Sequence, residues 1–168
     1  MQTLINGSPG TSVSVMDRGF LYGDGAFETL STIDGRPVLL SQHLARLESA
    51  CQLLKLRFDE GLVKKELFQL LQDASGSQIA KIIITRGVGG RGYRPSAESI
   101  PTRIIQLFEP TNPSPIEESL GVCITVCQHR LSQSEALAGV KHLNRLDQVL
   151  ASAELDENFY EGLCLDIQ

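Results

Sequence analysis

A single lysine stands directly ahead of a stretch with helical periodicity near the end of the chain. In the segment GVKHLNRLDQVLA, residues 139–151, apolar side chains recur at three- and four-residue steps from Leu143 onward, which predicts a helix. Lys141 lies at or before the start of that pattern. A lysine at such a place is most often a solvated charge. It can also be an amine held at a fixed point for covalent chemistry, and the segment alone leaves both readings open.

Arg46 is a second candidate for chemistry. It lies in the segment SQHLARLESACQLLKL, whose apolar residues follow a helical period. Its neighbours three and four residues away include no acidic side chain: Gln42, His43, Ser49 and Ala50. A simple ion pair within the helix therefore does not explain this arginine, although a solvated surface charge still can.

The third candidate is the loop RGVGGRGYRP, residues 86–95, which carries three arginines. Its glycines can serve as turn residues alone. The loop lacks the GxGxxG spacing of a dinucleotide site and the GK[ST] ending of a phosphate-binding P-loop. The three histidines have no metal-ligand spacing, so the sequence predicts no metal site. No Ser-His-Asp or Cys-His arrangement can be argued from spacing.

Composition limits the possible classes of protein. The 168 residues are 42% hydrophobic with a net charge of −5, typical of a soluble globular chain. The scattered basic residues argue against a nucleic-acid partner. No apolar run reaches membrane-spanning length, and the N-terminus has no features of a signal peptide. We therefore expect a soluble, cytoplasmic protein whose four cysteines (51, 123, 127 and 164) are free buried thiols.

Periodicity and turn residues predict the elements that must position these side chains. We expect strands over residues 1–5, 12–16, 26–33, 79–85, 103–107, 122–127 and 162–167, and a return strand beginning at 37–40 after the Asp34-Gly35 turn. Helices are predicted from an N-cap at Ser41 to residue 56, over residues 60–73, and after Lys141. Residues 17–25 read as a glycine-rich loop.

This order predicts an α+β fold in two parts. Residues 1–108 should form a two-layer lobe with helices on one face of an antiparallel sheet. Residues 109–116, which carry three prolines, are the best linker candidate. Residues 117–168 should begin a second, α/β barrel-like lobe. That lobe is too short to cover its own sheet and ends within a predicted strand, so we expect a fragment of a longer protein or a truncated gene product.

Four segments together resemble the fold-type IV pyridoxal-phosphate enzymes: MDRGFLYGDGAFET, LLSQHLARLESACQLL, ITRGVGGRGY and LAGVKHLNRLDQVLA. This family includes branched-chain aminotransferases, D-amino-acid aminotransferases and aminodeoxychorismate lyases. The first two segments are shared by much of the family, whereas GGRGY and GVKHLNRL are more particular to the bacterial lyases. The resemblance runs from residue 3 to the last residue without a large gap.

The resemblance implies a role for each candidate. Lys141 matches the lysine that bonds covalently to the aldehyde of pyridoxal 5'-phosphate, and Arg46 matches the arginine that contacts its phosphate. Phe27 matches an aromatic side chain in the pocket wall. Arg91 and Tyr93 match positions near the substrate carboxylate, with Arg86 and Arg94 as alternatives to Arg91. Lys141 and Arg46 should therefore face one cavity, with side-chain tips within about 10 Å.

The implied reaction converts 4-amino-4-deoxychorismate to 4-aminobenzoate and pyruvate, a step in folate synthesis. The family implies a homodimer with a small-molecule substrate and no membrane partner. Two alternatives remain: a same-fold aminotransferase for D- or branched-chain amino acids, and a catalytically inactive fragment of the lyase. Complete family members continue into a region with a glutamate that faces the pyridine nitrogen and most of the phosphate donors. We therefore expect these 168 residues to hold the cofactor poorly.

Overall fold

The computed structural model describes residues 2–110 and 119–167. The chain divides into two units, one of residues 1–110 with 140–143, and one of residues 111–139 with 144–168. Residues 111–116 of the predicted linker lie outside the described residues. Within the described ranges, no helix combines the length and the apolar character needed to cross a membrane.

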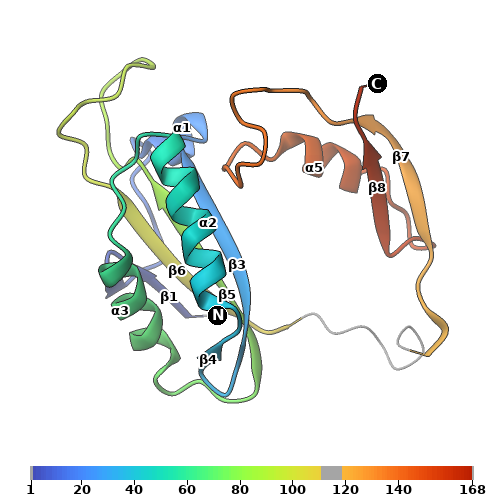
Figure 1. The fold of residues 1–168 in the computed structure, drawn as a ribbon, viewed down its shortest axis with the longest axis horizontal. Helices are drawn as coiled ribbons and strands as arrows, with labels where there is room; N and C mark the ends of the chain where they lie inside the picture. Colours follow the sequence, from blue (N-terminus) through green and yellow to red (C-terminus); the bar gives the residue numbers. More distant parts are fainter. Residues whose placement is uncertain (1, 111–118, 168) are drawn as a thin grey trace. The chain divides into compact units, whose positions relative to one another are not determined.

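The first unit contains one antiparallel sheet and three helices (Figure 1). Its strands pair in the order β2-β1-β6-β5-β3-β4, and every neighbouring pair is antiparallel. The strands are β1 (Gln2–Ile5), β2 (Ser8–Pro9), β3 (Gly25–Ile33), β4 (Arg36–Pro37), β5 (Ser77–Thr85) and β6 (Thr102–Phe108). The helices are α1 (Arg18–Tyr22), α2 (Leu40–Leu53) and α3 (Glu60–Leu71).

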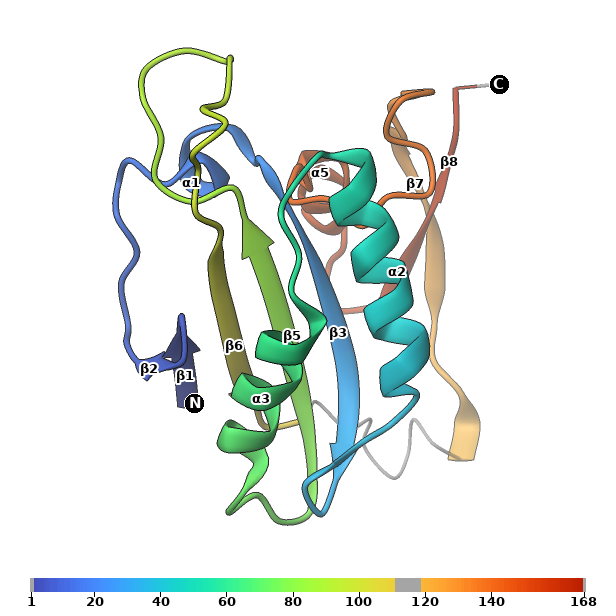
Figure 2. The ribbon, with the colours of Figure 1, turned by 60° about the vertical axis from the view of Figure 1, so that its left-hand side comes forward.

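Both long helices cover the same face of this sheet, as Figures 1 and 2 show. Alternate residues of β3, β5 and β6 point toward them, among them Ile82 and Ile105, which are fully buried. Leu44 on α2 and Val63 on α3 close the core from the other side. This arrangement confirms the predicted two-layer α+β lobe with an antiparallel sheet. Apart from Leu56, which lies between α2 and α3, the remaining buried apolar residues follow the same pattern of alternation in strands and three- or four-residue steps in helices.

The strand predicted over residues 12–16 is wrong. The sequence SVSVM alternates, but these residues form no strand, and Val15 is exposed. A strand needs a hydrogen-bonded neighbour, and alternation alone does not supply one. The short strand that pairs with β1 is instead Ser8–Pro9. The predicted return strand at 37–40 is also shorter and earlier, because β4 ends at Pro37.

Two helix starts differ from the prediction. The segment expected to be a loop, residues 17–25, contains α1, whose N-cap Asp17 accepts a hydrogen bond from the Gly19 amide at 2.7 Å. Gly23 ends that helix with φ 65°, a left-handed conformation that glycine adopts readily. Helix α2 begins at Leu40, and Leu39 takes the N-cap position without a side-chain cap. The Ser41 hydroxyl donates to the Gln42 side chain instead.

The second unit pairs two parallel strands, β7 (Ile124–Arg130) and β8 (Glu161–Leu165), connected through helix α5 (Leu146–Ser152). Parallel neighbours need such a crossover. Cys127 is buried and its thiol approaches the Ala151 carbonyl of α5 at 3.8 Å. All four cysteines are free, but Cys123 is exposed and Cys164 half-buried. The expectation that every thiol is buried is therefore wrong.

Candidate active site

Lys141 is fixed by main-chain hydrogen bonds along the free edge of β3. The Phe27 amide donates to the Lys141 carbonyl at 3.0 Å, and the Leu143 amide donates to the Gly25 carbonyl at 3.0 Å. Ala26 and His142 form an antiparallel bridge between these two bonds. The segment 140–143 therefore belongs to the first unit. Lys141 lies ahead of α5 as predicted, and its backbone is held to β3 by these two hydrogen bonds on either side of an isolated bridge.

Gly25 is required by this close approach of the 140–143 segment. A Cβ atom on residue 25 would lie 2.5 Å from the Ile84 carbonyl oxygen and 2.7 Å from a side-chain carbon of Leu143. Real Cβ atoms do not approach a main-chain oxygen so closely, so only glycine fits between β5 and the Lys141 segment.

The amine of Lys141 lies over an aromatic ring. Its Nζ is 4.5 Å from the centroid of the Phe27 ring, a cation–π distance. The amine of Lys81 on β5 lies 5.3 Å from the same centroid. Phe27 was expected as a wall of the pocket, and its ring contacts both amines. Lys81 was not singled out from the sequence, because nothing local distinguishes it from other strand lysines.

Arg46 is bound to a carboxylate that comes from β3. Its Nε donates to Glu28 Oε1 at 2.5 Å and its Nη2 donates to Glu28 Oε2 at 2.7 Å. The His43 Nδ1 lies 2.8 Å from Glu28 Oε2. Glu28 is fully buried, whereas 54% of the Arg46 side chain remains exposed. The sequence correctly showed that no helix neighbour pairs with Arg46, but the partner on β3 was missed.

The three side chains form one electrostatic unit. Burial alone would raise the pKa of the Glu28 carboxyl, but hydrogen bonds from Arg46 and His43 and their charges hold that pKa below its ordinary value. Glu28 is therefore an anion in the folded protein at neutral pH. The sequence contained a signal that Glu28 is paired. Ala26 and Leu30 on the same face of β3 are apolar, and a carboxylate buried among them needs a partner.

Phe27 and Glu28 are consecutive residues of β3, and each anchors one of the two predicted cofactor residues. Successive side chains of a strand point to opposite faces of the sheet. Phe27 contacts the Lys141 amine, and Glu28 holds the Arg46 guanidinium. The primary amine and the guanidinium are thus both held by neighbouring residues of one strand, and that they face one cavity stays a prediction.

The predicted substrate residues Arg91 and Tyr93 lie on the glycine-rich loop and are exposed, Tyr93 to 84%. The buried Arg18 guanidinium holds this loop by donating to the carbonyl oxygens of Gly92 and Tyr93, both at 2.8 Å. The rings of Tyr22 and Tyr93 also lie 5.4 Å apart. Within the described part of the chain, we find no contact that joins Arg91 or Tyr93 to Arg46. Their relation to the site stays a prediction.

Arg86 has structural partners. It donates to both carboxylate oxygens of Asp24, at 2.7 and 2.9 Å, and to the carbonyls of Leu54 and Lys55 after the end of α2. Such carbonyls at a helix C-terminus lack partners within the helix. Burial alone would raise the pKa of the Asp24 carboxyl, but hydrogen bonds from Arg86 and Arg18 and their charges lower it. These bonds disfavour Arg86 as the alternative to Arg91.

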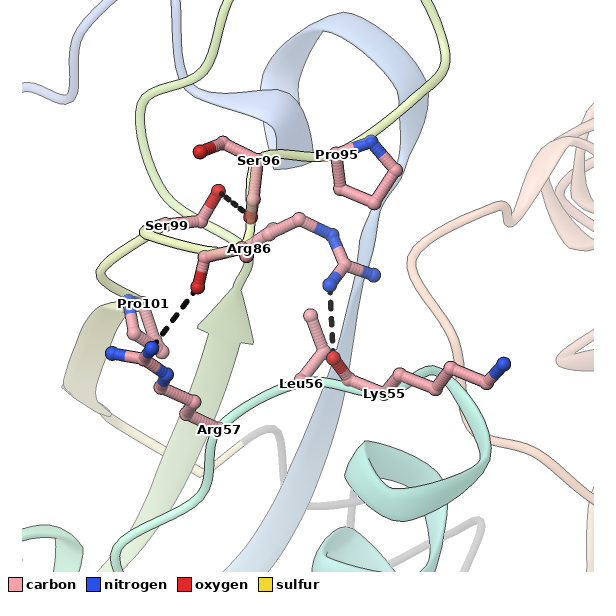
Figure 3. A pocket seen from close by; sticks show the side chains of 9 residues that line it. Lys55, Leu56, Arg57, Arg86, Pro95, Ser96, Ser99 and Pro101 are labelled. Carbon is pink, nitrogen blue, oxygen red and sulfur yellow. Dashed lines mark hydrogen bonds between the residues drawn. The ribbon is translucent and has the colours of Figure 1, made fainter.

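A cavity of about 230 Å³ lies beside Arg86, between the end of α2 and the loop before β6 (Figure 3). Arg57 donates to the Ala97 carbonyl at 3.0 Å, and Ser99 donates to the Ser96 carbonyl at 2.9 Å. Figure 3 shows the Lys55 amine directed away from the two serines. The polar groups of this cavity mainly fasten loops to one another, which favours a structural role over a ligand site.

Comparisons with known proteins identify the family. Residues 25–168 match the model of the class IV aminotransferases. The chain is 37% identical over 167 residues to an aminodeoxychorismate lyase of Vibrio harveyi, covering 98% of this chain and 61% of that protein. It is 28% identical over 151 residues to a D-alanine aminotransferase of Bacillus licheniformis, covering 87% of this chain and 51% of that protein.

A solved structure agrees with these matches. The 4-amino-4-deoxychorismate lyase of Pseudomonas aeruginosa has a TM-score of 0.91 and 44% identity, over 98% of this chain and 61% of that one. This chain thus spans about three fifths of the length of both lyases. The mixed α/β fold and the sequence of this chain agree, and the chain belongs to the class IV aminotransferase family.

Proposed function

We propose that this chain acts in a pyridoxal 5'-phosphate-dependent lyase that converts 4-amino-4-deoxychorismate to 4-aminobenzoate and pyruvate. The observation that carries the proposal is the attachment of Lys141 to β3, beside Phe27 and the Glu28–Arg46 pair, in a chain 37% identical to one such lyase and 44% identical to another. The segments GGRGY and KHLNRL favour the lyase over its aminotransferase relatives.

The donor set fits the cofactor. A primary amine can bond covalently to an aldehyde, and a guanidinium suits phosphate because of its planar fork of donors. In the described residues, Arg46 uses Nε and Nη2 toward Glu28, so Nη1 can face a phosphate. Lys141 would hold the cofactor and Arg46 would contact its phosphate. The cofactor, when bound, supplies an electron sink for the reacting carbon.

Lys141 would also move a proton. Its Nζ, held over the Phe27 ring, would accept the proton from the substrate ring carbon that bears the amine. Loss of the enolpyruvyl group as pyruvate would follow, because it leaves an aromatic ring behind. A neutral amine is needed for this step.

Substrate recognition would fall to Phe27, Arg91 and Tyr93. Phe27 offers an apolar wall for the substrate ring, and the Arg91 guanidinium offers a partner for a carboxylate. The Arg18 bonds to the loop would limit how far Tyr93 can move. We further propose that residues 117–168 contribute to a barrel-like cofactor lobe, and that the complete protein is a cytoplasmic homodimer.

An aminotransferase acting on D- or branched-chain amino acids is the second candidate. The match to a D-alanine aminotransferase over 87% of the chain favours it. Both reactions would use Lys141 as the base. They differ in what leaves the substrate, so the products separate them. A catalytically inactive chain would give neither product.

The test supplies the protein with pyridoxal 5'-phosphate and 4-amino-4-deoxychorismate, then measures 4-aminobenzoate by fluorescence and pyruvate by an enzyme-coupled assay. The proposal predicts equimolar products that Lys141→Ala abolishes. A parallel reaction with D-alanine or a branched-chain amino acid and 2-oxoglutarate measures glutamate. Glutamate without 4-aminobenzoate would establish the aminotransferase, and no product from either reaction would contradict both.

A further inference from the structure

We propose that Glu28 is a positioning residue that presents Arg46 to a phosphate group. This inference rests on the proposed function, in which Arg46 contacts the cofactor phosphate. Glu28 itself would touch neither cofactor nor substrate. Its effect would be carried by the orientation of the Arg46 side chain.

The geometry of the pair supports this role. Glu28 is fully buried in the central part of β3, and its two oxygens receive two donors of the Arg46 fork at 2.5 and 2.7 Å. A bidentate contact fixes both the position and the plane of a guanidinium. His43 holds Glu28 Oε2 from the same helix at 2.8 Å. The carboxylate therefore has little freedom, and it transfers the rigidity of the sheet to Arg46.

Without this contact, Arg46 would be an ordinary arginine on a helix. The side chain is 54% exposed despite the contact. A free arginine carries about 2 kcal/mol of rotamer entropy that binding must remove. In the folded chain the contact with Glu28 already restricts that freedom, because Nε and Nη2 are bound and the plane of the guanidinium then fixes the direction of Nη1.

Charge and position predict opposite results for a substitution of Glu28. Glu28 is an anion near the phosphate that Arg46 would bind, so its charge opposes phosphate binding. If charge alone mattered, Glu28→Gln would strengthen phosphate binding. If position matters, the same substitution weakens it, because a neutral amide cannot accept both guanidinium donors with its two terminal atoms. The sign of the change therefore separates the two explanations.

The experiment compares pyridoxal 5'-phosphate with pyridoxal, which lacks the phosphate. For each variant of the full chain, borohydride-trapped adduct on Lys141 is measured against ligand concentration by peptide mass spectrometry. The ratio of the two half-saturation concentrations reports how well the phosphate is recognised. Glu48→Gln, on the exposed face of α2, is the matched control, and circular dichroism checks the fold of every variant.

We expect Glu28→Gln to reduce the preference for the phosphorylated ligand by roughly tenfold, the value of one charge-assisted hydrogen bond. Binding of pyridoxal should change less than twofold. Arg46→Ala should give the same loss, and the double variant should lose no more. If Glu28→Gln fails to fold, Glu28→Asp keeps the charge but shortens the side chain. Its loss of preference then carries the same conclusion.

Two results would overturn the proposal in different ways. If Arg46→Ala lowers the preference for phosphate but both Glu28 variants keep or increase it, Glu28 does not position Arg46, and the proposed cofactor contact survives. If Arg46→Ala has no effect, or the parent chain shows no preference for phosphate, the cofactor contact itself is wrong and the positioning role fails with it.

Discussion

Substitution of Asp24 should loosen the glycine-rich loop that carries the proposed substrate residues. Asp24 accepts hydrogen bonds from Arg18 at 2.9 Å and from two nitrogens of Arg86 at 2.7 and 2.9 Å. Arg18 in turn holds the loop carbonyls of Gly92 and Tyr93. Asp24→Asn removes the single negative charge that these ion pairs share, while the two guanidinium groups stay where they are.

The size of the effect follows from burial. The exposed fractions of the three side chains are only 15% for Asp24, 4% for Arg18 and 13% for Arg86. Breaking a buried ion pair by removing one partner costs about 3–5 kcal/mol, because the remaining charge is uncompensated. Asparagine can keep one acceptor, and both arginines keep their carbonyl partners. We therefore expect a loss of about 3 kcal/mol in the free energy of unfolding.

Urea unfolding of the parent chain, Asp24→Asn and the exposed control Asp73→Asn measures this loss directly. Hydrogen exchange should show faster exchange in residues 87–95 of the Asp24 variant, because Arg18, which holds the Gly92 and Tyr93 carbonyls, is itself held less firmly without the Asp24 carboxylate. Unfolding of Asp24→Asn within about 0.5 kcal/mol of the Asp73 control would contradict the proposed role of these ion pairs. Unchanged exchange rates in the loop would contradict it as well.

Three further outcomes follow from the same structure. Gly25→Ala should lower the free energy of unfolding in urea by at least about 2 kcal/mol, because the new methyl group meets a carbonyl oxygen of the facing strand. The control Gly90→Ala has open space around the new methyl group and should be near neutral. Because the pKa of Glu28 is lowered in the folded protein, the unfolded chain binds more protons in acid than the folded chain does. The free energy of unfolding should therefore fall as the pH drops below about 4.3, and Glu28→Gln should make this fall less steep. Burial raises the pKa of the Cys51 thiol to about 12. At pH 8, iodoacetamide should therefore label the exposed Cys123 in the native protein and leave Cys51 unmodified. Equal labelling of the two thiols would contradict the burial of Cys51.

The parts of the fold that were predictable have strong local patterns. The β-branched run around Ile82 to Ile84 is a central strand, and the periodic leucines of α2 and α3 face the sheet. The alternation of apolar and polar residues at Val13 and Val15 gave a wrong prediction, because a strand there would have no neighbouring strand for hydrogen bonding. Ser41 has the right chemistry for an N-cap, yet the N-cap of α2 is Leu39, two residues earlier.

The candidate site was predictable only in its matched residues. Lys141 and Arg46 were found through resemblance to a family, and the structure adds the contacts around them. The bonds that tie Lys141 to β3 are main-chain bonds, which no side-chain pattern encodes. The pairing of Arg46 with Glu28 joins residues from a strand and a helix, so it depends on packing that sequence spacing does not show.

The most direct test is to determine which residue of the protein holds pyridoxal 5'-phosphate covalently. The chain is mixed with the cofactor, the covalent adduct is trapped with borohydride, and the labelled peptide is mapped by mass spectrometry. We predict label on Lys141, because its backbone is fixed to β3 and its amine lies over Phe27. Label spread over Lys55, Lys64, Lys65 and Lys81, with no preference for Lys141, would contradict it.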